Sequence, residues 1–307
     1  METIIELSGV AKSYGSTPAL RGADAEVQAG STALVGANGA GKTTLLKLLL
    51  GFLAPDGGSV RVLGRSLPAQ ARVVREKVGY MPEGDCLPGD SPAAEFVGLM
   101  AQLGGLPPRH ARERASELLW QVGLGEERHR PIGGFSTGMK QRVKLAQALV
   151  HGPELVLLDE PTDGMDPTGR SEMLELIDRL RRELGVSVLL STHLLGDVER
   201  VCERAVILDA GRILVHGSLE ELAGDAEPLF ELDLHDNGQP VREELERRGL
   251  IVSGSNGSGL VVRGTGVPRL GRDLAAERSW PLRRLVKRRR SLEDVYLRLQ
   301  RAESQAE

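Results

Sequence analysis

A glycine-rich segment at residues 36–44 has the residue types and the spacing that a phosphate-binding loop needs. It reads GANGAGKTT and fits the pattern Gly-x-x-x-x-Gly-Lys followed by Ser or Thr. Backbone N–H groups of such a loop point at phosphate, and the N-terminus of the following helix adds positive potential. Its lysine reaches the terminal phosphates, and the hydroxyl after it ligates Mg²⁺. The phosphate-binding residues predicted here are Gly36, Asn38, Gly39, Ala40, Gly41, Lys42, Thr43 and Thr44.

Two carboxylates follow the apolar run in ELVLLDEPT, at residues 154–162. Asp159 comes first after the run and suits the Mg²⁺ site near Thr43. Glu160 suits a base that polarises an attacking water, because phosphoryl transfer depends mainly on positioning and charge placement. An acidic pair at the end of a strand is also common in loops without a catalytic role. The phosphate loop that precedes this pair favours the functional interpretation.

A second candidate anion site lies in FSTGMKQR, at residues 135–142. Ser136 and Gly138 stand where a loop enters a predicted helix, whose N-terminal N–H groups attract an anion. Taken alone, the pattern favours the simpler interpretation, a Ser residue that caps a helix. The order of the motifs in the chain favours the anion site instead. A single domain needs only one phosphate cradle. The second one therefore suggests that this segment contacts the nucleotide of another subunit.

The elements that must position these residues alternate between short apolar strands and amphipathic helices up to about residue 222. Strands are predicted at 4–7, 31–36, 59–64 and 77–82, and again in the apolar runs that end near residues 160, 192 and 210. A helix is predicted over 43–53, ended by Pro55. Residues 84–150 are helical in character. The pattern predicts an α/β domain with a buried parallel sheet and a helical insertion.

The composition changes after Leu222. A strand at 228–234, a helix at 240–248, strands near 250–253 and 259–263, a second helix and a strand at 282–287 give the order βαββαβ. This order suggests a small ferredoxin-like unit. We therefore predict two domains, residues 1–224 with a helical subdomain at about 84–150, and an accessory α/β domain at 225–307.

Over about residues 3–222, these motifs and their order resemble the ATP-binding cassette family, the nucleotide-binding subunits of ABC transporters. The resemblance implies a P-loop NTPase (RecA-like) core with a helical signature subdomain. It also implies that Tyr14 stacks on adenine and that His193, in STHLL, is a switch histidine that acts with the catalytic Glu160. Glu83, in YMPEGD, occupies the position of the lid glutamine and would ligate Mg²⁺ beside Thr43 and Asp159.

The same resemblance implies an ATPase whose cofactors are ATP and Mg²⁺. In this family, the signature of one subunit closes over the ATP of a second, so we expect a head-to-tail homodimer. A separate integral membrane permease would be the further partner, and the protein would lie on the cytoplasmic face of the cell membrane. Its working cycle would begin with closure of the dimer on ATP and end with its reopening after hydrolysis.

Two departures from the family pattern refine this expectation. The signature reads FSTGM in place of LSGGQ but retains Ser136 and Gly138, and glutamate replaces glutamine at position 83. A Pro-Glu pair at this point resembles the type-two exporter group. ATPases of that group also end in a small domain with a final helix similar to SLEDVYLRL, at 291–299. Export is inferred from this resemblance alone.

Composition limits the alternatives. The 307 residues carry a net charge of −4, from 39 basic and 43 acidic residues, which argues against a dedicated nucleic-acid binder. Cys86 and Cys202 are too few for a disulfide framework or a four-cysteine zinc site. The N-terminus lacks a secretory pattern, and the most apolar run, 45–54, is too short to span a bilayer, so we expect a soluble intracellular protein.

Two other functions were weighed. A soluble ABC ATPase acting on ribosomes or DNA is the main alternative. Such proteins usually carry two cassettes or long coiled-coil insertions, and neither is apparent here. A degenerate module that binds ATP without hydrolysing it is disfavoured, because Lys42, Asp159, Glu160 and His193 are all present.

Overall fold

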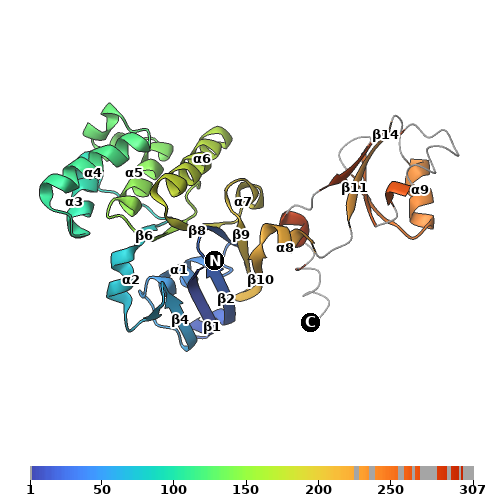
Figure 1. The fold of residues 1–307 in the computed structure, drawn as a ribbon, viewed down its shortest axis with the longest axis horizontal. Coiled ribbons are helices and arrows are strands. Elements are labelled where there is room, and N and C mark those ends of the chain that lie inside the picture. Colours follow the sequence, from blue (N-terminus) through green and yellow to red (C-terminus); the bar gives the residue numbers. More distant parts are fainter. Residues whose placement is uncertain are drawn as a thin grey trace. The chain divides into compact units, whose positions relative to one another are not determined.

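In the computed structural model, the chain forms two compact units, residues 1–219 and 220–307 (Figure 1). The structure describes residues 2–224, 228–234, 239–254, 259–264, 267–269, 282–288, 292–296 and 299. Unit 1 contains every residue that the sequence analysis assigns to chemistry. Its fold is that of a P-loop NTPase core with a helical subdomain, as predicted.

The main sheet of unit 1 has six strands in the order β10-β9-β3-β8-β7-β6. All neighbouring pairs are parallel except β9 with β10. Every residue of β3, β7 and β8 is buried, which explains why these strands are continuous apolar runs. Because five strands run parallel, their carboxyl ends meet at one edge. The strands are β3 (Ser31–Val35), β6 (Val78–Met81), β7 (Leu155–Asp159), β8 (Ser187–Thr192), β9 (Arg204–Asp209) and β10 (Arg212–Ser218).

A second, antiparallel sheet of unit 1 has the order β2-β1-β4-β5. It is formed by β1 (Thr3–Tyr14), β2 (Thr17–Gln28), β4 (Gly57–Val62) and β5 (Arg65–Leu67). The sequence analysis predicted only the first part of β1 and missed β2. The buried positions of β2 include Ala23 and Ala25, and alanine gives little strand signal. Leucines of α1 (Lys42–Leu49) join strands of both sheets in one apolar core.

The predicted extent of the first helix was wrong, because α1 ends at Leu49 and not near residue 53. Gly51 follows with a φ of 65°, and the N–H of Phe52 donates to the carbonyl of Lys47 at 2.9 Å. This is the Schellman pattern, in which a left-handed glycine ends the helix and satisfies its last carbonyls. Gly51 therefore ends the helix, four residues before Pro55.

The helical subdomain follows α2 (Ala71–Lys77) and β6, and contains α3 (Ala93–Leu103), α4 (Pro108–Gln121) and α5 (Thr137–Leu149). Helix α5 lies directly against β6. An ideal Cβ at Gly79 would stand 2.0 Å from the carbonyl oxygen of Ala148, so only glycine permits this approach. Helices α6 (Pro167–Leu184) and α7 (Leu195–Val201) complete unit 1. No helix in the described ranges combines the length and apolarity that crossing a bilayer requires.

Unit 2 has its own sheet, in the antiparallel order β12-β13-β11-β14. Its elements after α8 (Leu219–Gly224) are β11 (Leu229–Leu234), α9 (Gln239–Arg247), β12 (Ile251–Gly254), β13 (Gly259–Arg263) and β14 (Leu282–Arg288). Phe230, Leu245 and Val262 are among the residues of a separate apolar core. The ferredoxin-like assignment stays a prediction, because most of the second connecting segment lies outside the described residues. Residues 292–296 of the predicted final helix are helical.

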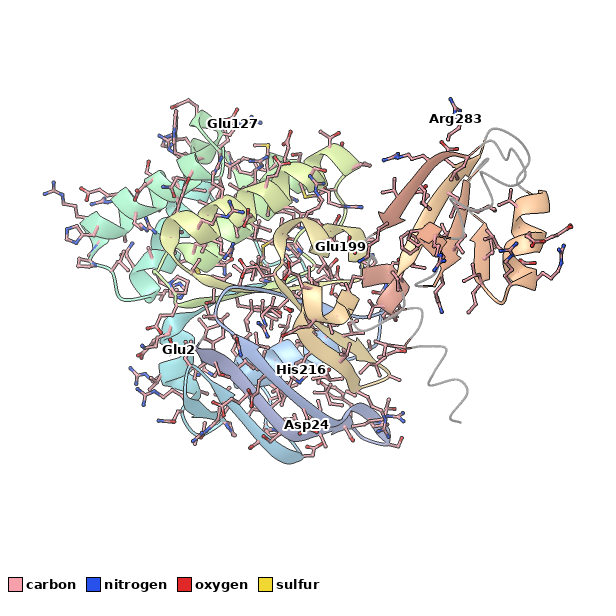
Figure 2. The ribbon with its side chains drawn as sticks, turned by 45° about the vertical axis from the view of Figure 1, so that its right-hand side comes forward. Glu2, Asp24, Glu127, Glu199, His216 and Arg283 are labelled. Carbon is pink, nitrogen blue, oxygen red and sulfur yellow. The ribbon has the colours of Figure 1, made fainter. Side chains whose placement is uncertain are left out.

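Strand β14 is one edge strand of this sheet and is rich in basic residues, with the sequence LRRLVKR. Arg283, Arg284 and Lys287 are exposed, and Figure 2 shows Arg283 extending away from the sheet. Charged side chains on an edge strand hinder pairing with a strand of another chain. Solvation of the edge is sufficient to account for these charges.

The contact between β6 and α5 leads to a stability prediction. We expect Gly79→Ala to lower the free energy of unfolding of unit 1 by about 1–3 kcal/mol, because the new methyl group overpacks a backbone contact. The midpoint of urea-induced unfolding measures this. Gly196→Ala is the control, since a Cβ at Gly196 in α7 meets nothing within 4 Å. Equal midpoints for the two variants would contradict the close packing.

Candidate active site

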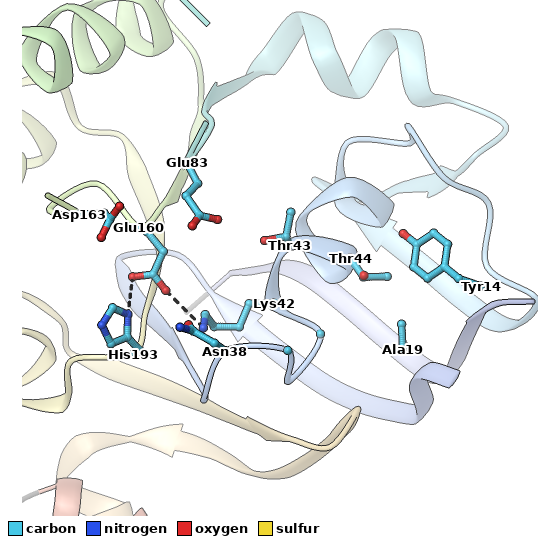
Figure 3. Close-up of a pocket in the computed structure, with 12 residues that line it drawn as sticks. Tyr14, Ala19, Asn38, Lys42, Thr43, Thr44, Glu83, Glu160, Asp163 and His193 are labelled. Atoms are coloured by element: carbon cyan, nitrogen blue, oxygen red, sulfur yellow. Dashed lines mark hydrogen bonds and ion pairs between the residues drawn. The ribbon is translucent and has the colours of Figure 1, made fainter. Parts of the chain in front are cut away.

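A cavity of about 460 Å³ lies at the carboxyl ends of the parallel strands (Figure 3). The loop after β3, the turn after β7 and the residues that follow β6 and β8 all contribute to it, as is usual for ligand sites of open α/β sheets. Ten of its twelve lining residues were predicted from the sequence; Ala19 and Asp163 were not. The predicted ones are Tyr14, Asn38, Gly39, Gly41, Lys42, Thr43, Thr44, Glu83, Glu160 and His193.

The loop from Gly36 to Gly41 depends on glycine at two close approaches. A Cβ at Gly36 would lie 2.3 Å from the carbonyl oxygen of Leu208, and one at Gly41 would lie 2.6 Å from that of Ala19. Gly41 also has a φ of 110°, which side-chain-bearing residues rarely adopt. Gly36 and Ala40 do not line the cavity and contribute through the backbone of the loop. Helix α1 begins at Lys42 without a side-chain cap, so its N-terminus faces the cavity uncapped.

Lys42 is held at the centre of the site. Its Nζ donates to the carbonyl oxygen of Gly36 at 2.7 Å and to that of Ala37 at 3.3 Å, and it lies 3.2 Å from Glu160 Oε1. The other oxygen, Glu160 Oε2, lies 3.0 Å from Nδ1 of His193 (Figure 3). Lys42 is 6% exposed and Glu160 7%. A buried ammonium is thus neutralised by a buried carboxylate that also contacts the imidazole.

Asp159 contacts Thr43 and is buried, with 1% of its surface exposed. The Thr43 hydroxyl donates to Asp159 Oδ2 at 3.1 Å, and the Ser191 hydroxyl donates to Oδ1 at 2.7 Å. Burial, and next the charge of Asp159, raise the pKa of Tyr80, so that its hydroxyl stays protonated beside the carboxylate. Sequence analysis missed Ser191 and Tyr80. Only the parallel pairing of β6 and β8 with β7 brings them to Asp159.

A left-handed turn separates the two consecutive carboxylates. Glu160 has a φ of 46°, and its N–H donates to the carbonyl oxygen of Ser191 at 3.1 Å. A residue other than glycine in this region is strained and persists only when its surroundings fix it. The turn allows Asp159 to face Thr43 while Glu160 faces Lys42 and His193.

The donor atoms around Thr43 suit a hard divalent cation. They are a hydroxyl and the carboxylate oxygens of Asp159, and Glu83 lines the same cavity. In the described part of the chain, no group of three or more His, Cys, Asp or Glu side chains is arranged to hold a metal ion by itself. Mg²⁺ is usually bound by one or two carboxylates together with phosphate oxygens and water, and the residues present fit that mode.

Ser136 and Gly138 are not brought into this cavity. Ser136 is the N-cap of α5, and its hydroxyl accepts from the N–H of Met139 at 3.3 Å. Gly138 faces the segment after Glu160, since a Cβ there would lie 3.3 Å from Cε of Met165. The phosphate loop and the signature of one chain are therefore separate surfaces.

A second cavity, of about 670 Å³, begins three residues after Glu83. It lies between the loop from Cys86 to Pro88 and the face of α3 that carries Phe96 and Leu99. Leu99 and Leu103, one helical turn apart on α3, are 51% and 74% exposed. Large exposed apolar side chains beside a hollow are typical of contact surfaces.

Comparison with known proteins agrees with this geometry. A family model described as ABC transporter matches residues 20–163. An uncharacterized ABC transporter ATP-binding protein, YxlF of Bacillus subtilis, is 36% identical over 96% of this chain and 99% of its own length. The daunorubicin/doxorubicin resistance ATP-binding protein DrrA of Streptomyces peucetius is 35% identical over 79% of this chain and 73% of its own. The bacitracin transport ATP-binding protein BcrA of Bacillus licheniformis is 33% identical over 78% of each chain.

Solved structures give the same result. An ATP-binding subunit of an ABC transporter is 31% identical, with a TM-score of 0.64 over 72% of this chain and 92% of that one. The dimeric cassette MJ0796, in a post-hydrolysis state bound to ADP and Pi, is 25% identical, with a TM-score of 0.64 over 70% of this chain and 99% of that one.

The position of Glu160 leads to a catalytic prediction. We expect Glu160→Gln to slow ATP hydrolysis by roughly 10²–10⁴-fold, because the amide cannot accept a proton from the attacking water. ATP binding should be retained or strengthened, since the carboxylate that competes for Lys42 at 3.2 Å is gone. Phosphate release and equilibrium binding of a fluorescent ATP analogue measure the two effects.

Asp163→Asn is the matched control, because Asp163 lines the same cavity but does not contact Lys42 in the described contacts. We expect it to lose much less turnover than Glu160→Gln. Near-normal turnover of Glu160→Gln would rule out Glu160 as the base.

Proposed function

The chain belongs to the ABC transporter family of ATP-binding proteins, and from this premise we propose that it is the ATPase subunit of an exporter with a separate permease. One observation carries the proposal. A single cavity contains Lys42 and Thr43 for the phosphates, Glu83 for the metal, and Glu160 with His193 for the attacking water. A module that only binds nucleotide would not need the last pair.

ATP binding changes the partner of Lys42. The nucleotide phosphates take the place of the Glu160 carboxylate beside the ammonium, and the loop N–H groups and the N-terminus of α1 bind the same phosphates. Tyr14, which is 50% exposed at the rim of the cavity, is free to stack on the adenine ring. Thr43, Asp159 and Glu83 would hold Mg²⁺, which would supply positive charge beside the phosphates.

Hydrolysis follows from the release of Glu160. Once Lys42 binds phosphate, the carboxylate accepts a proton from a water molecule in line with the γ-phosphate. His193 keeps its contact with Glu160 and fixes the direction of that carboxylate. Water attacks the γ-phosphorus, the bond to the β-phosphate oxygen breaks, and ADP is the leaving group.

A second subunit completes the site. Ser136 and Gly138 stand at the N-terminus of α5, a 13-residue helix, outside the chain's own cavity. The proposal assigns them to the γ-phosphate bound by a second copy of this chain, arranged head to tail. Support comes from the dimeric cassette among the similar structures.

The permease docks at the second cavity. This hollow is apolar at Leu87, Pro88, Phe96 and Leu99 and polar at Ser91 and Glu95, which suits an amphipathic helix of a membrane protein. The second cavity begins just after Glu83. Movement of the docked helix and ligation of Mg²⁺ by Glu83 would therefore both shift the same loop. The chain would lie on the cytoplasmic face of the membrane through this contact.

Export is the proposed direction of transport. The similar proteins include those named for drug resistance, for bacitracin transport and for Nod factor export. Their cargoes differ, so the permease, and not this subunit, would select the cargo.

A mixing experiment tests whether the signature acts in trans. Ser136→Arg and Lys42→Ala should each abolish hydrolysis, the first by filling the anion site of α5 and the second by removing the phosphate contact. In a mixed dimer, one composite site carries both lesions and the other neither. In an equimolar mixture, random pairing makes about half of the dimers mixed, and each mixed dimer has one intact site of two. About a quarter of wild-type activity should therefore be restored. A mixture as inactive as its components would contradict the head-to-tail arrangement.

Coupling is tested at Glu83 in vesicles that contain the permease. We expect Glu83→Ala to reduce permease-stimulated ATPase and transport more than it reduces ATP binding, because ligation by Glu83 distinguishes the ATP-bound state. Glu83→Gln should retain most coupling, since an amide oxygen still ligates Mg²⁺. Asp85→Ala removes an exposed carboxylate from the same loop as a control. Unchanged transport per ATP in Glu83→Ala would exclude this residue as the coupling point.

A further inference from the structure

Lys144 of α5 is a buried cation with an unusual pair of partners. It is 4% exposed, and its Nζ donates to the carbonyl oxygens of Pro82 at 3.1 Å and Glu83 at 2.9 Å. Among the described interactions it makes no ion pair with a carboxylate, unlike Lys42. A buried ammonium is costly unless it is well hydrogen-bonded, so these two carbonyls fix its position. In return, Lys144 fixes the backbone at the point where β6 passes into the loop that carries Glu83.

A second contact keeps α5 and β6 from sliding past one another. One turn after Lys144, the backbone of Ala148 lies so close to Gly79 that no Cβ fits between them. The helix and the strand therefore meet at two points, one on the strand and one at its carboxyl end. Displacement of the Glu83 backbone acts directly on α5.

The same face of α5 also holds the other loop of the nucleotide cavity. Gln141, one turn before Lys144, is buried, and its Nε2 donates to the carbonyl oxygen of Asp163 at 3.3 Å. Glu83 and Asp163 both line the cavity. Helix α5 thus binds the backbones of two loops around the site of its own chain, while Ser136 and Gly138 form its N-terminal end.

We propose that Lys144 is a positioning residue that ties the Glu83 loop to the signature helix. When Glu83 shifts to ligate the metal of bound ATP, the carbonyls of residues 82 and 83 move Lys144, and α5 moves with it. Binding of ATP at one nucleotide site thereby moves Ser136 and Gly138, which contact the nucleotide at the second site. This last step rests on the head-to-tail dimer of the proposed function; the link from Lys144 to the loop does not.

The link can be tested in the isolated chain with a spin label. Cys86 is exposed and lies three residues after Glu83, whereas Cys202 is buried, so a nitroxide reagent labels the loop. Lys144→Met keeps the apolar stem and removes the donors. We expect this variant to narrow the lines of the nitroxide's electron paramagnetic resonance spectrum. The loop loses its two hydrogen bonds to Lys144 and therefore moves more freely. Lys144→Arg restores donors and should restore the broader lines. Lys47→Met removes an exposed lysine from α1 and is the control.

The kinetic readout separates positioning from ATP binding. Lys144→Met should lower kcat by about 10-fold or more and leave the dissociation constant for ATP within about twofold, since Lys144 does not contact the nucleotide cavity. If Lys144 merely stabilised the fold, its substitution would lower the midpoint of thermal unfolding and would not lower kcat selectively. If Lys144→Met does not fold, Lys144→Leu, which also removes the donors and has a shorter apolar side chain, carries the same comparison.

The outcomes distinguish the link from the dimer. Narrowed lines with lowered kcat, reversed by Lys144→Arg, support the proposal. Unchanged lines in Lys144→Met or Lys144→Leu overturn it, whatever the mixing experiment with Ser136→Arg shows. Narrowed lines with unchanged kcat overturn the role in positioning. Failure of the mixing experiment alone removes the second subunit and leaves the link within one chain intact.

Discussion

The buried contact between Lys42 and Glu160 is the interaction on which the rest of the site depends. An ammonium with 6% exposure needs compensating charge, and two carbonyls and one carboxylate supply it. Every neighbouring feature serves this contact. Glycine at positions 36 and 41 lets the loop pass close enough for its carbonyls to reach Nζ, and the left-handed turn at Glu160 aims the carboxylate at it. In the proposed function, phosphate and carboxylate compete for this one cation, so nucleotide binding would also release the base.

Part of this site follows from local sequence, because the phosphate loop and the acidic pair are each contiguous in the chain. The spacing of glycines before Lys42 and Thr43 predicts a tight loop that leads into a helix, and the close approaches at Gly36 and Gly41 agree with it. The apolar runs before Asp159 and His193 predict buried strands, and parallel strands deliver their last residues to the same edge. Local pattern assigned Glu160, and the resemblance to the family assigned Tyr14, Glu83 and His193; the structure places all four around one cavity.

What the sequence did not predict depends on contacts between distant segments. Ser191 is an ordinary strand residue until β8 pairs with β7 and brings its hydroxyl within 2.7 Å of Asp159. Strand β2 was missed because its buried positions include Ala23 and Ala25, and alanine gives little strand signal. The end of α1 was misplaced because a glycine in the left-handed region is as strong a stop as the more conspicuous proline. The roles of Ser136 and Gly138 stay predictions, since one chain holds them apart from its own cavity.

Two buried lysines use the same chemistry for opposite purposes. Both Lys42 and Lys144 place an ammonium against a pair of backbone carbonyls, but only Lys42 also has a carboxylate nearby. A charged partner can be exchanged for phosphate, so Lys42 responds to the ligand. Neutral carbonyls of the chain cannot be exchanged for a ligand, so Lys144 keeps the Glu83 loop joined to α5 whatever is bound. In the two proposals, Lys42 binds the nucleotide and Lys144 transmits its binding to α5, because the carbonyls that Lys144 holds belong to the loop of Glu83.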